Sequence, residues 1–254
     1  MDRSQLIELL RDVRAGAVAP DDAAKRIGDL PYAEVVHAVG ATLIDHHREL
    51  RTGVPEIVFG AGKTAEQIAA ALGELATRDR AIATRVDADK AARIAQLVPA
   101  ARYHELARVV TLGDAGERPR CGTIAVVCAG TSGLPVAEEA ALVAEFLGAP
   151  VVRVSDVGVA GLHRLLARLD DIRRADVVVA VAGMEAALPS VLGGLVDRPL
   201  IAVPTSVGYG VSVDGLVALG ALLAGCAPGI TVVNIDNGVG AAVAAVRIAR
   251  LAAR

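Results

Sequence analysis

The chain has 254 residues, of which 54% are hydrophobic, and its formal net charge is −3 at pH 7. This composition supports a large core in one or two domains and argues against a disordered chain. The chain has no basic excess and only 2% aromatic residues, so it lacks the cationic surface and the stacking platforms that bind nucleic acids. We expect no nucleic-acid partner.

Segments that address a protein to a membrane or to an oxidising compartment are not expected either. The N-terminal run MDRSQLIELLRD is charged throughout, unlike a signal peptide. The uncharged run 215–234 is long enough to span a membrane, but four glycines and one proline interrupt it, so a helix, a loop and a buried strand fit better. The three cysteines show no CxxC or CxxH spacing, which argues against a disulfide framework or zinc site and indicates a reducing cytoplasm.

The first part of the chain predicts a small α/β unit. Residues 1–30 have the apolar spacing of two short helices, and a further helix is expected at 31–45. A strand at 56–59, a Gly-Ala-Gly turn and a helix from Lys63 follow. Two further apolar runs, 81–86 and 107–112, flank a helix at 89–97, and the Gly/Pro-rich stretch 113–119 is typical of a linker. We therefore expect an N-terminal domain of residues 1–118.

The second part, residues 119–254, alternates apolar strands with helices. The predicted strands are 122–128, 150–154, 175–181, 200–203 and 231–235, and the predicted helices are 134–147, 160–169, 186–196, 214–224 and 240–253. Strands that are apolar throughout are typical of a parallel sheet covered on both faces. The prediction is an α/β protein with a doubly wound, flavodoxin-like three-layer domain behind a smaller N-terminal α/β domain. Neither a GxGxxG motif nor a complete P-loop is present.

Polar residues that follow the first two of these strands are candidate ligand contacts. Gly130, Thr131 and Ser132 form a small, hydroxyl-bearing strand-to-helix turn, which suits a backbone cradle for phosphate, or else an ordinary capped turn. After the second strand, Asp156 is placed for a ribose hydroxyl or a metal, and His163 for proton transfer. Alternatively, Asp156 caps a helix and His163 lies half-exposed on its first turns.

The third and fourth strands also end in candidate residues. Gly183, Met184 and Glu185 follow the third strand, and a carboxylate in such apolar surroundings suits a general base. The other interpretation is that Glu185 only complements the helix dipole. The segment 206–210, with Ser206 and Tyr209, is either a polar loop that closes over a ligand or a plain connection.

The stretch GCAPGITVVNIDNGVGAA at 225–242 carries the candidate nucleophile. Cys226 lies between glycines and ahead of Pro228, the freer setting that a reactive thiol needs. A buried, inert thiol is the alternative, and it describes Cys121 and Cys128 better. Asp236 and Asn237 follow the last strand, where open α/β sheets keep their sites, and either one can cap the next helix.

The N-terminal part carries a dense charged set around the segment RTGVPEIVFGAGKT. It comprises Asp45, Arg48, Arg51, Glu56 and Lys63. A solvated face explains most such runs. Because these charges surround a glycine-rich turn, a second anion site that uses Arg51 and Lys63 is the competing interpretation.

Together these motifs resemble the aminoimidazole ribonucleotide carboxylase (PurE) superfamily. The matching features are the hydroxyl-bearing first turn, Leu162-His163-Arg164 in the second, the glycine-containing third turn, and VPTSVGYGVSVDGL after the fourth strand. The chain is more similar to the LarB family of nickel-pincer nucleotide biosynthesis, through DHHRELRTGVPEIVFGAGKT, CAGTSGLPVAEEA, SDVGVAGLHRL, AGMEAALPSVLGGL, PTSVGYG and CAPGITVVNIDNGVGAA. Two positions depart from the family pattern: Gly133 stands where Asp is common, and Val239 where Phe is common.

The resemblance implies an enzyme that acts on nicotinic acid adenine dinucleotide. It would carboxylate the pyridinium ring with carbon dioxide and split the phosphoanhydride, releasing AMP, with magnesium assisting the hydrolysis. Cys226 would add to the ring, Glu185 would remove a proton, and His163, Ser132 and Asp156 would line the ring and phosphate site. The resemblance also implies a homo-octamer.

Two other functions stay open. An aminoimidazole ribonucleotide carboxylase or mutase would not need Cys226, because its substrate is already an enamine. A non-catalytic nucleotide-binding protein would bind ligand without turnover and would have no reactive thiol.

Overall fold

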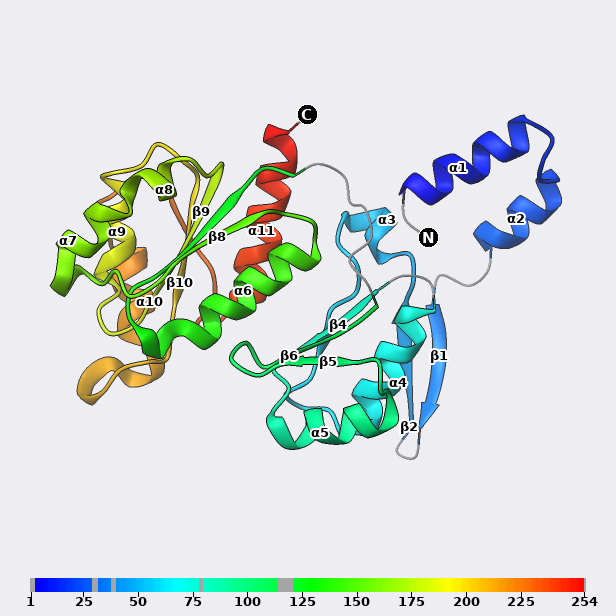
Figure 1. The fold of residues 1–254 in the computed structure, drawn as a ribbon, viewed down its shortest axis with the longest axis horizontal. Coiled ribbons are helices and arrows are strands. Elements are labelled where there is room, and N and C mark those ends of the chain that lie inside the picture. The colour runs from blue at the N-terminus through cyan, green and yellow to red at the C-terminus, as the bar shows by residue number, and fades with distance from the viewer. Residues whose placement is uncertain (1–2, 29–31, 38–39, 78–79, 114–120, 254) are drawn as a thin grey trace. The chain divides into compact units, whose positions relative to one another are not determined.

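The computed structural model of the protein describes residues 3–28, 32–37, 40–77, 80–113 and 121–253. In the main, the chain divides into an N-terminal unit that ends at Asp114 and a C-terminal unit that runs from Ala115 to Arg254 (Figure 1). The domain boundary predicted between residues 118 and 119 falls in the stretch 114–120, which lies outside the described residues.

The C-terminal unit is built on one parallel sheet. Its strands are β7 (Ile124–Cys128), β8 (Val151–Val154), β9 (Val177–Ala182), β10 (Leu200–Pro204) and β11 (Ile230–Val232). They lie in the order β11-β10-β9-β7-β8, and every neighbouring pair is parallel. All residues of β7, β9 and β10 are buried, as apolar strands between two helical layers must be.

Helices cover both faces of this sheet. They are α6 (Leu134–Phe146), α7 (Leu162–Ala167), α8 (Leu169–Arg173), α9 (Ala187–Gly193), α10 (Leu216–Leu223) and α11 (Gly238–Ala252), with short 3-10 turns η1 (Thr131–Gly133), η2 (Val159–Gly161) and η3 (Gly210–Gly215). Helices α6 and α11 pack together on one face, and α8, α9 and α10 pack on the other (Figure 1). The predicted three-layer α/β fold is confirmed.

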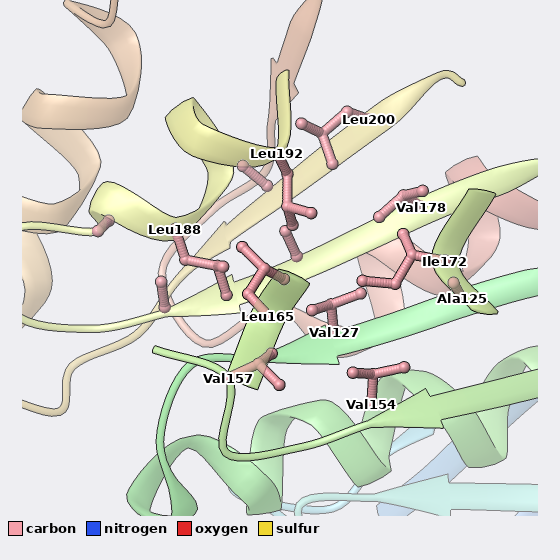
Figure 2. Close-up of a cluster of buried hydrophobic side chains, with 14 of the residues drawn as sticks. Ala125, Val127, Val154, Val157, Leu165, Ile172, Val178, Leu188, Leu192 and Leu200 are labelled. Atoms are coloured by element: carbon pink, nitrogen blue, oxygen red, sulfur yellow. The ribbon is translucent and has the colours of Figure 1, made fainter. Parts of the chain in front are cut away.

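The core between the sheet and the second helical layer is made of small and medium aliphatic side chains. Figure 2 shows Val127 and Val178 of the sheet facing Leu165, Leu188 and Leu192 of the helices. These side chains are at most 1% exposed, and each fully buried Leu or Val contributes about 1.5–3 kcal/mol to stability. This packing holds the strand ends, and therefore the loops that follow them, in place.

The N-terminal unit begins with two helices and a hairpin. The helices are α1 (Arg3–Arg14) and α2 (Pro20–Gly28), as predicted. The helix predicted at 31–45 is wrong, because these residues form the antiparallel strands β1 (Tyr32–His37) and β2 (Gly40–Asp45). Exposure alternates along β1, with Tyr32 and Val36 outside and Val35 packed against the core. This period of two, in a segment rich in β-branched residues, favours a strand.

The rest of the N-terminal unit is a second, mixed sheet. Its elements are α3 (Arg48–Thr52), β3 (Val58–Phe59), α4 (Ala65–Ala76), β4 (Ala81–Thr84), α5 (Ala88–Leu97), β5 (Arg102–His104) and β6 (Val109–Leu112). The order is β3-β4-β6-β5, with β3 and β4 parallel and the other pairs antiparallel. The predicted strands are present in shortened form, and the predicted helices are present within about two residues of their expected starts. The short elements α3 and β5, of five and three residues, were not predicted.

Candidate functional site

The C-terminal sheet has a cleft at the carboxyl ends of its strands. From β7 the chain passes to β8 on one side and then to β9 on the other, and such a reversal is where open α/β sheets bind ligands. A cleft of about 540 Å³ lies there, lined by residues that follow β7, β8, β9 and β10. This volume is in the range of small-molecule sites.

The turn after β7 forms one wall of the cleft. Gly130, Ser132 and Gly133 line it, whereas Thr131 is exposed and is not among the lining residues. Helix α6 starts directly behind this turn, and no side chain of the described residues caps its N-terminus. The Leu134 N–H donates to the Thr131 carbonyl and Pro135 has no N–H, so it is mainly the helix dipole that favours an anion at this end.

Gly133 packs tightly against the end of β7. A Cβ atom at this position would lie 3.0 Å from Sγ of the buried Cys128. A larger residue would therefore need a small shift of that thiol. The departure from the family pattern removes a polar side chain from this wall and leaves the backbone and Ser132 in its place.

An ion pair forms the second wall. Asp156, which follows β8 with a φ of +59°, pairs with Arg164 of α7, and both side chains line the cleft. Arg164 was missed by the sequence analysis, which chose its neighbour His163. The structure places His163 on the exposed side of α7, outside the cleft-lining residues. The sequence feature that could have identified Arg164 is its place on the first turn of a helix that follows a strand ending at the site.

The segments after β9 and β10 form the remaining wall. Gly183, Met184 and Glu185 all line the cleft, as does Tyr209, which is 80% exposed. The Met184 N–H donates to the Val207 carbonyl at 3.0 Å, which joins the two segments. Glu185 is exposed at this edge, so the desolvated surroundings expected for it are not found within a single chain.

Three other predicted residues support this wall without lining it. The Ser206 N–H donates to Oδ1 of Asp236 at 2.8 Å, which ties the β10 loop to the end of β11. Oδ1 of Asn237 accepts from the Gly240 N–H at 2.8 Å and so caps α11. Asn237 is the predicted cap, and Asp236 is a loop anchor.

Thr205 was also missed. It follows β10 directly, is fully buried, and lines the cleft. Its Oγ1 has no hydrogen-bond partner in the described structure. A threonine immediately after a strand-ending proline was the only sequence signal.

Backbone strain concentrates at this edge of the sheet. Among the described residues, eight non-glycine residues have positive φ, and six of these follow strands of the C-terminal sheet: Asp156, Met184, Ala186, Val213, Asp214 and Asp236. This left-handed conformation is unfavourable for most residues, and for β-branched Val213 (φ +45°) above all. Such strain tends to collect at functional sites.

The three thiols have different environments. Burial raises the pKa of Cys128 to about 11 and also raises the pKa of the half-buried Cys121, so both stay protonated at neutral pH. Cys226 is exposed, which agrees with the freer setting expected for it between glycines.

Cys226 does not lie in the cleft of its own chain. It lies in the turn between α10 and β11, at the amino ends of the strands, whereas the cleft lies at their carboxyl ends. Ala187, at the start of α9, lines the cleft. A Cβ atom on Gly193, at the other end of α9, would lie 3.0 Å from Cβ of Ala227. The Cys226 turn therefore packs against the end of α9 that is remote from the cleft.

Arg51 and the glycine-rich turn before Lys63 have partners within the N-terminal unit. Arg51 donates to both carboxylate oxygens of Asp45, at 3.2 and 2.5 Å, and this hydrogen bonding holds the pKa of Asp45 below its usual value. Nζ of Lys90 donates to the carbonyls of Gly60 and Ala61, both at 3.2 Å, in the turn that precedes the half-buried Lys63. Much of the glycine-rich turn is therefore satisfied by the protein.

No group of three or more His, Cys, Asp or Glu residues in the described ranges is arranged to hold a metal ion. Mg²⁺ is usually held by one or two carboxylates together with substrate phosphates, so the predicted magnesium stays a prediction. None of the helices in the described part of the chain has both the length and the apolar character needed to cross a membrane.

Comparison with known proteins agrees with this architecture. Residues 36–114 match the LarB/PurE-like N-terminal domain, and residues 123–254 match AIR carboxylase. The chain is 37% identical over 255 residues to the uncharacterized protein MJ0165 of Methanocaldococcus jannaschii, covering 97% of each chain. It is 35% identical over 133 residues to the N5-carboxyaminoimidazole ribonucleotide mutase of the same organism, which covers 50% of this chain and 79% of the mutase. The chain therefore belongs to the PurE superfamily and has a LarB-like architecture, a LarB/PurE-like N-terminal domain followed by an AIR carboxylase domain.

Proposed function

We propose that this protein carboxylates the pyridinium ring of nicotinic acid adenine dinucleotide with carbon dioxide and hydrolyses the phosphoanhydride. The products would be pyridinium-3,5-biscarboxylic acid mononucleotide and AMP, for nickel-pincer cofactor synthesis. The observation that carries the proposal is the match to a LarB/PurE-like N-terminal domain in front of the carboxylase domain. The alternative function, a purine-type mutase, does not account for this first domain.

The cleft supports the binding of a nucleotide. The uncapped start of α6 and the guanidinium of Arg164 lie on one side and suit phosphate oxygens. The opposite side, with Met184, Val207 and Tyr209, is more apolar and suits a planar ring. Glu185 lies on this second side, within the segment that would face the ring.

The chemistry requires a nucleophilic ring carbon, which a pyridinium ion does not have. In our hypothesis the Cys226 thiolate adds to the ring and forms a C–S bond, and the ring electron pair moves to nitrogen, giving a neutral enamine. The enamine carbon attacks carbon dioxide. Glu185 then takes the proton from that carbon, the C–S bond breaks, and the thiolate leaves as the ring regains aromaticity. In a separate step, water attacks a phosphorus of the anhydride and AMP departs.

Because Cys226 lies away from the cleft of its own chain, our hypothesis requires that a second copy of the chain supplies this thiol. Large apolar side chains extend from the mouth of the cleft to the Cys226 turn: Tyr209, Val211, Val213, Leu216 and Leu223 are 56–83% exposed. An exposed apolar surface of this kind is typical of an assembly interface. We propose a homo-oligomer, an octamer by resemblance, in which the Cys226 turn of one chain meets the cleft of another.

The direct test is to incubate the full chain with nicotinic acid adenine dinucleotide, bicarbonate and magnesium, and to follow the products by mass spectrometry. A mononucleotide heavier by one carbon dioxide, formed together with AMP, is expected. Absence of turnover with this dinucleotide, together with acceptance of N5-carboxyaminoimidazole ribonucleotide, would replace the proposal by the mutase. The similarity of the C-terminal domain to such a mutase makes that the second candidate.

Sharing of the site between chains has its own test. Cys226→Ser chains keep the cleft, and Arg164→Gln chains keep the thiol. At a dinucleotide concentration below the wild-type KM, mixed oligomers of the two variants should therefore be more active than the sum of the two variants measured separately. Subunit exchange without any recovery would contradict a thiol supplied by the partner chain.

A further inference from the structure

The hydroxyl of Thr205 is a polar group without a partner at the floor of the cleft. Thr205 is 0% exposed, and its Oγ1 makes no hydrogen bond in the described structure. Its backbone N–H donates to the Ala182 carbonyl of β9 at 2.9 Å. This bond holds the residue at the end of the sheet.

The neighbouring Gly183 lies directly against this hydroxyl. A Cβ atom at position 183 would lie 2.7 Å from Oγ1 of Thr205 and 2.4 Å from the Val207 carbonyl oxygen, which is too close for a carbon atom. Both Gly183 and Thr205 line the cleft. Only glycine at position 183 therefore allows the segment after β9 to pass this close to the Thr205 hydroxyl.

An unused buried hydroxyl is costly to the folded protein. Leaving such a group without a hydrogen bond costs about 1–3 kcal/mol, and the great majority of buried polar side-chain atoms in proteins have a partner. A ligand that supplies the missing partner recovers this energy on binding. A site built in this way also discriminates against analogues that lack the matching polar atom.

We infer that the Thr205 hydroxyl contacts the substrate and donates a hydrogen bond to a carboxylate oxygen on its ring. This inference rests on the proposed function for the identity of the ring. Arg164 and the start of α6 lie on the phosphate side of the cleft, whereas Thr205 belongs to the β10 segment on the ring side. A nicotinate ring and a carboxylated aminoimidazole ring both carry the required carboxylate, so the second candidate function calls for the same contact.

The test compares Thr205→Val, which keeps the shape but removes the hydroxyl, with Thr205→Ser, which keeps the hydroxyl. Thr231→Val serves as the matched control, because Thr231 is exposed on β11 and lies outside the cleft. Binding of nicotinic acid adenine dinucleotide to the full chain is measured by titration calorimetry. Thr205→Val should raise Kd roughly 10- to 100-fold, and Thr205→Ser and Thr231→Val should stay close to wild type. AMP, which lacks the ring carboxylate, should bind all variants equally.

Unfolding in denaturant separates this role from a structural one. If the hydroxyl bonds only to ligand, it destabilises the ligand-free protein. Thr205→Val should therefore unfold at the same or a higher denaturant concentration than wild type. Equal binding of the dinucleotide by Thr205→Val and wild type would overturn the inference. Destabilisation by valine that serine restores would also overturn it, because the hydroxyl would then be structural.

Failure of the proposed function gives a different result. If wild type binds N5-carboxyaminoimidazole ribonucleotide but not the dinucleotide, the proposed function fails, and the same titration with that ligand decides the role of Thr205. If the wild-type protein binds neither carboxylated ligand, both the proposed function and the inferred role of Thr205 are overturned.

Discussion

Each unit of the chain contains a junction in which a parallel strand, a glycine-containing turn and a helix follow one another. The two junctions differ in whether their backbone polar groups are hydrogen-bonded by side chains of the protein. In the N-terminal unit, Thr64 and Gln67 form a complete capping box at the start of α4. Lys90 hydrogen-bonds two carbonyls of the turn. In the C-terminal unit, no described side chain caps α6, and the turn faces the cleft.

This difference shows why a glycine-rich turn alone does not identify a ligand site. A turn whose donors and acceptors are satisfied by the chain contributes to folding. A turn whose helix N-terminus stays open, next to strained residues and an unused hydroxyl, keeps its hydrogen-bonding capacity for a ligand. We therefore expect substitutions in the C-terminal junction to affect activity and those in the N-terminal junction to affect stability.

The largest effect is expected from Cys226→Ser. The alcohol is a far weaker nucleophile, so carboxylation should fall on the order of a thousandfold or more, as for other covalent nucleophiles. Carboxylated product is quantified by mass spectrometry. Cys121→Ser is the matched control, because burial raises the pKa of Cys121 and keeps this thiol protonated. A fully active Cys226→Ser protein would exclude the covalent route.

A smaller effect is expected from Arg164→Gln, compared with Lys90→Gln in the other unit. Loss of charge-assisted hydrogen bonds to phosphate should raise KM for the dinucleotide roughly 10- to 100-fold. Lys90→Gln should leave KM unchanged and lower only the unfolding midpoint. Similar KM values for Arg164→Gln and wild type would remove Arg164 from the phosphate site.

The hydroxyls of the two junctions provide a third comparison. Thr64→Ala removes the capping box and should lower the free energy of unfolding by about 1 kcal/mol without changing turnover. Ser132→Ala should lower turnover without changing the free energy of unfolding, because Ser132 is exposed and lines the cleft. Denaturant unfolding and steady-state kinetics on both variants measure the two effects. An equal loss of stability in both variants would show that the two junctions are not different.

The smallest effect concerns pH and the Asp45–Arg51 pair. The hydrogen bond from Arg51 lowers the pKa of Asp45 below its usual 3.8. Because the folded pKa is the lower one, the pair stabilises the protein above pH 3.8, and this contribution is lost as the pH falls through the lowered value. Arg51→Gln should therefore unfold slightly more easily than wild type near neutral pH and equally easily in strong acid. The exposure of Arg51 to solvent keeps the difference small.

The C-terminal fold was largely predictable from the sequence because its strands are apolar without interruption. Each predicted strand of this sheet is present within a few residues. The segment 31–45 was mispredicted because its strands are short and half-exposed, so that their alternation is weak beside apparent helical spacing.

The candidate site was predictable in part. Residues that directly follow strands, such as Gly130, Asp156 and Gly183, line the cleft as expected, since the carboxyl ends of parallel strands meet at one edge. His163 and Arg164 are adjacent in sequence, and only the orientation of α7 selects Arg164. The sequence offers no way to see that Thr205 lacks a partner, because satisfaction of a hydroxyl depends on every neighbour in space.

By itself, the sequence determined the parallel C-terminal sheet, the family and the edge at which ligand-contacting residues gather, because these depend on local periodicity and on the order of motifs. Only the tertiary structure decided that Cys226 lies at the opposite edge from the cleft, that Lys90 and Gln67 satisfy groups of the N-terminal turn, and that Gly183 lies directly against the Thr205 hydroxyl. Those relations depend on distances between segments that are remote in the chain, which are established only when the helices pack on their sheets.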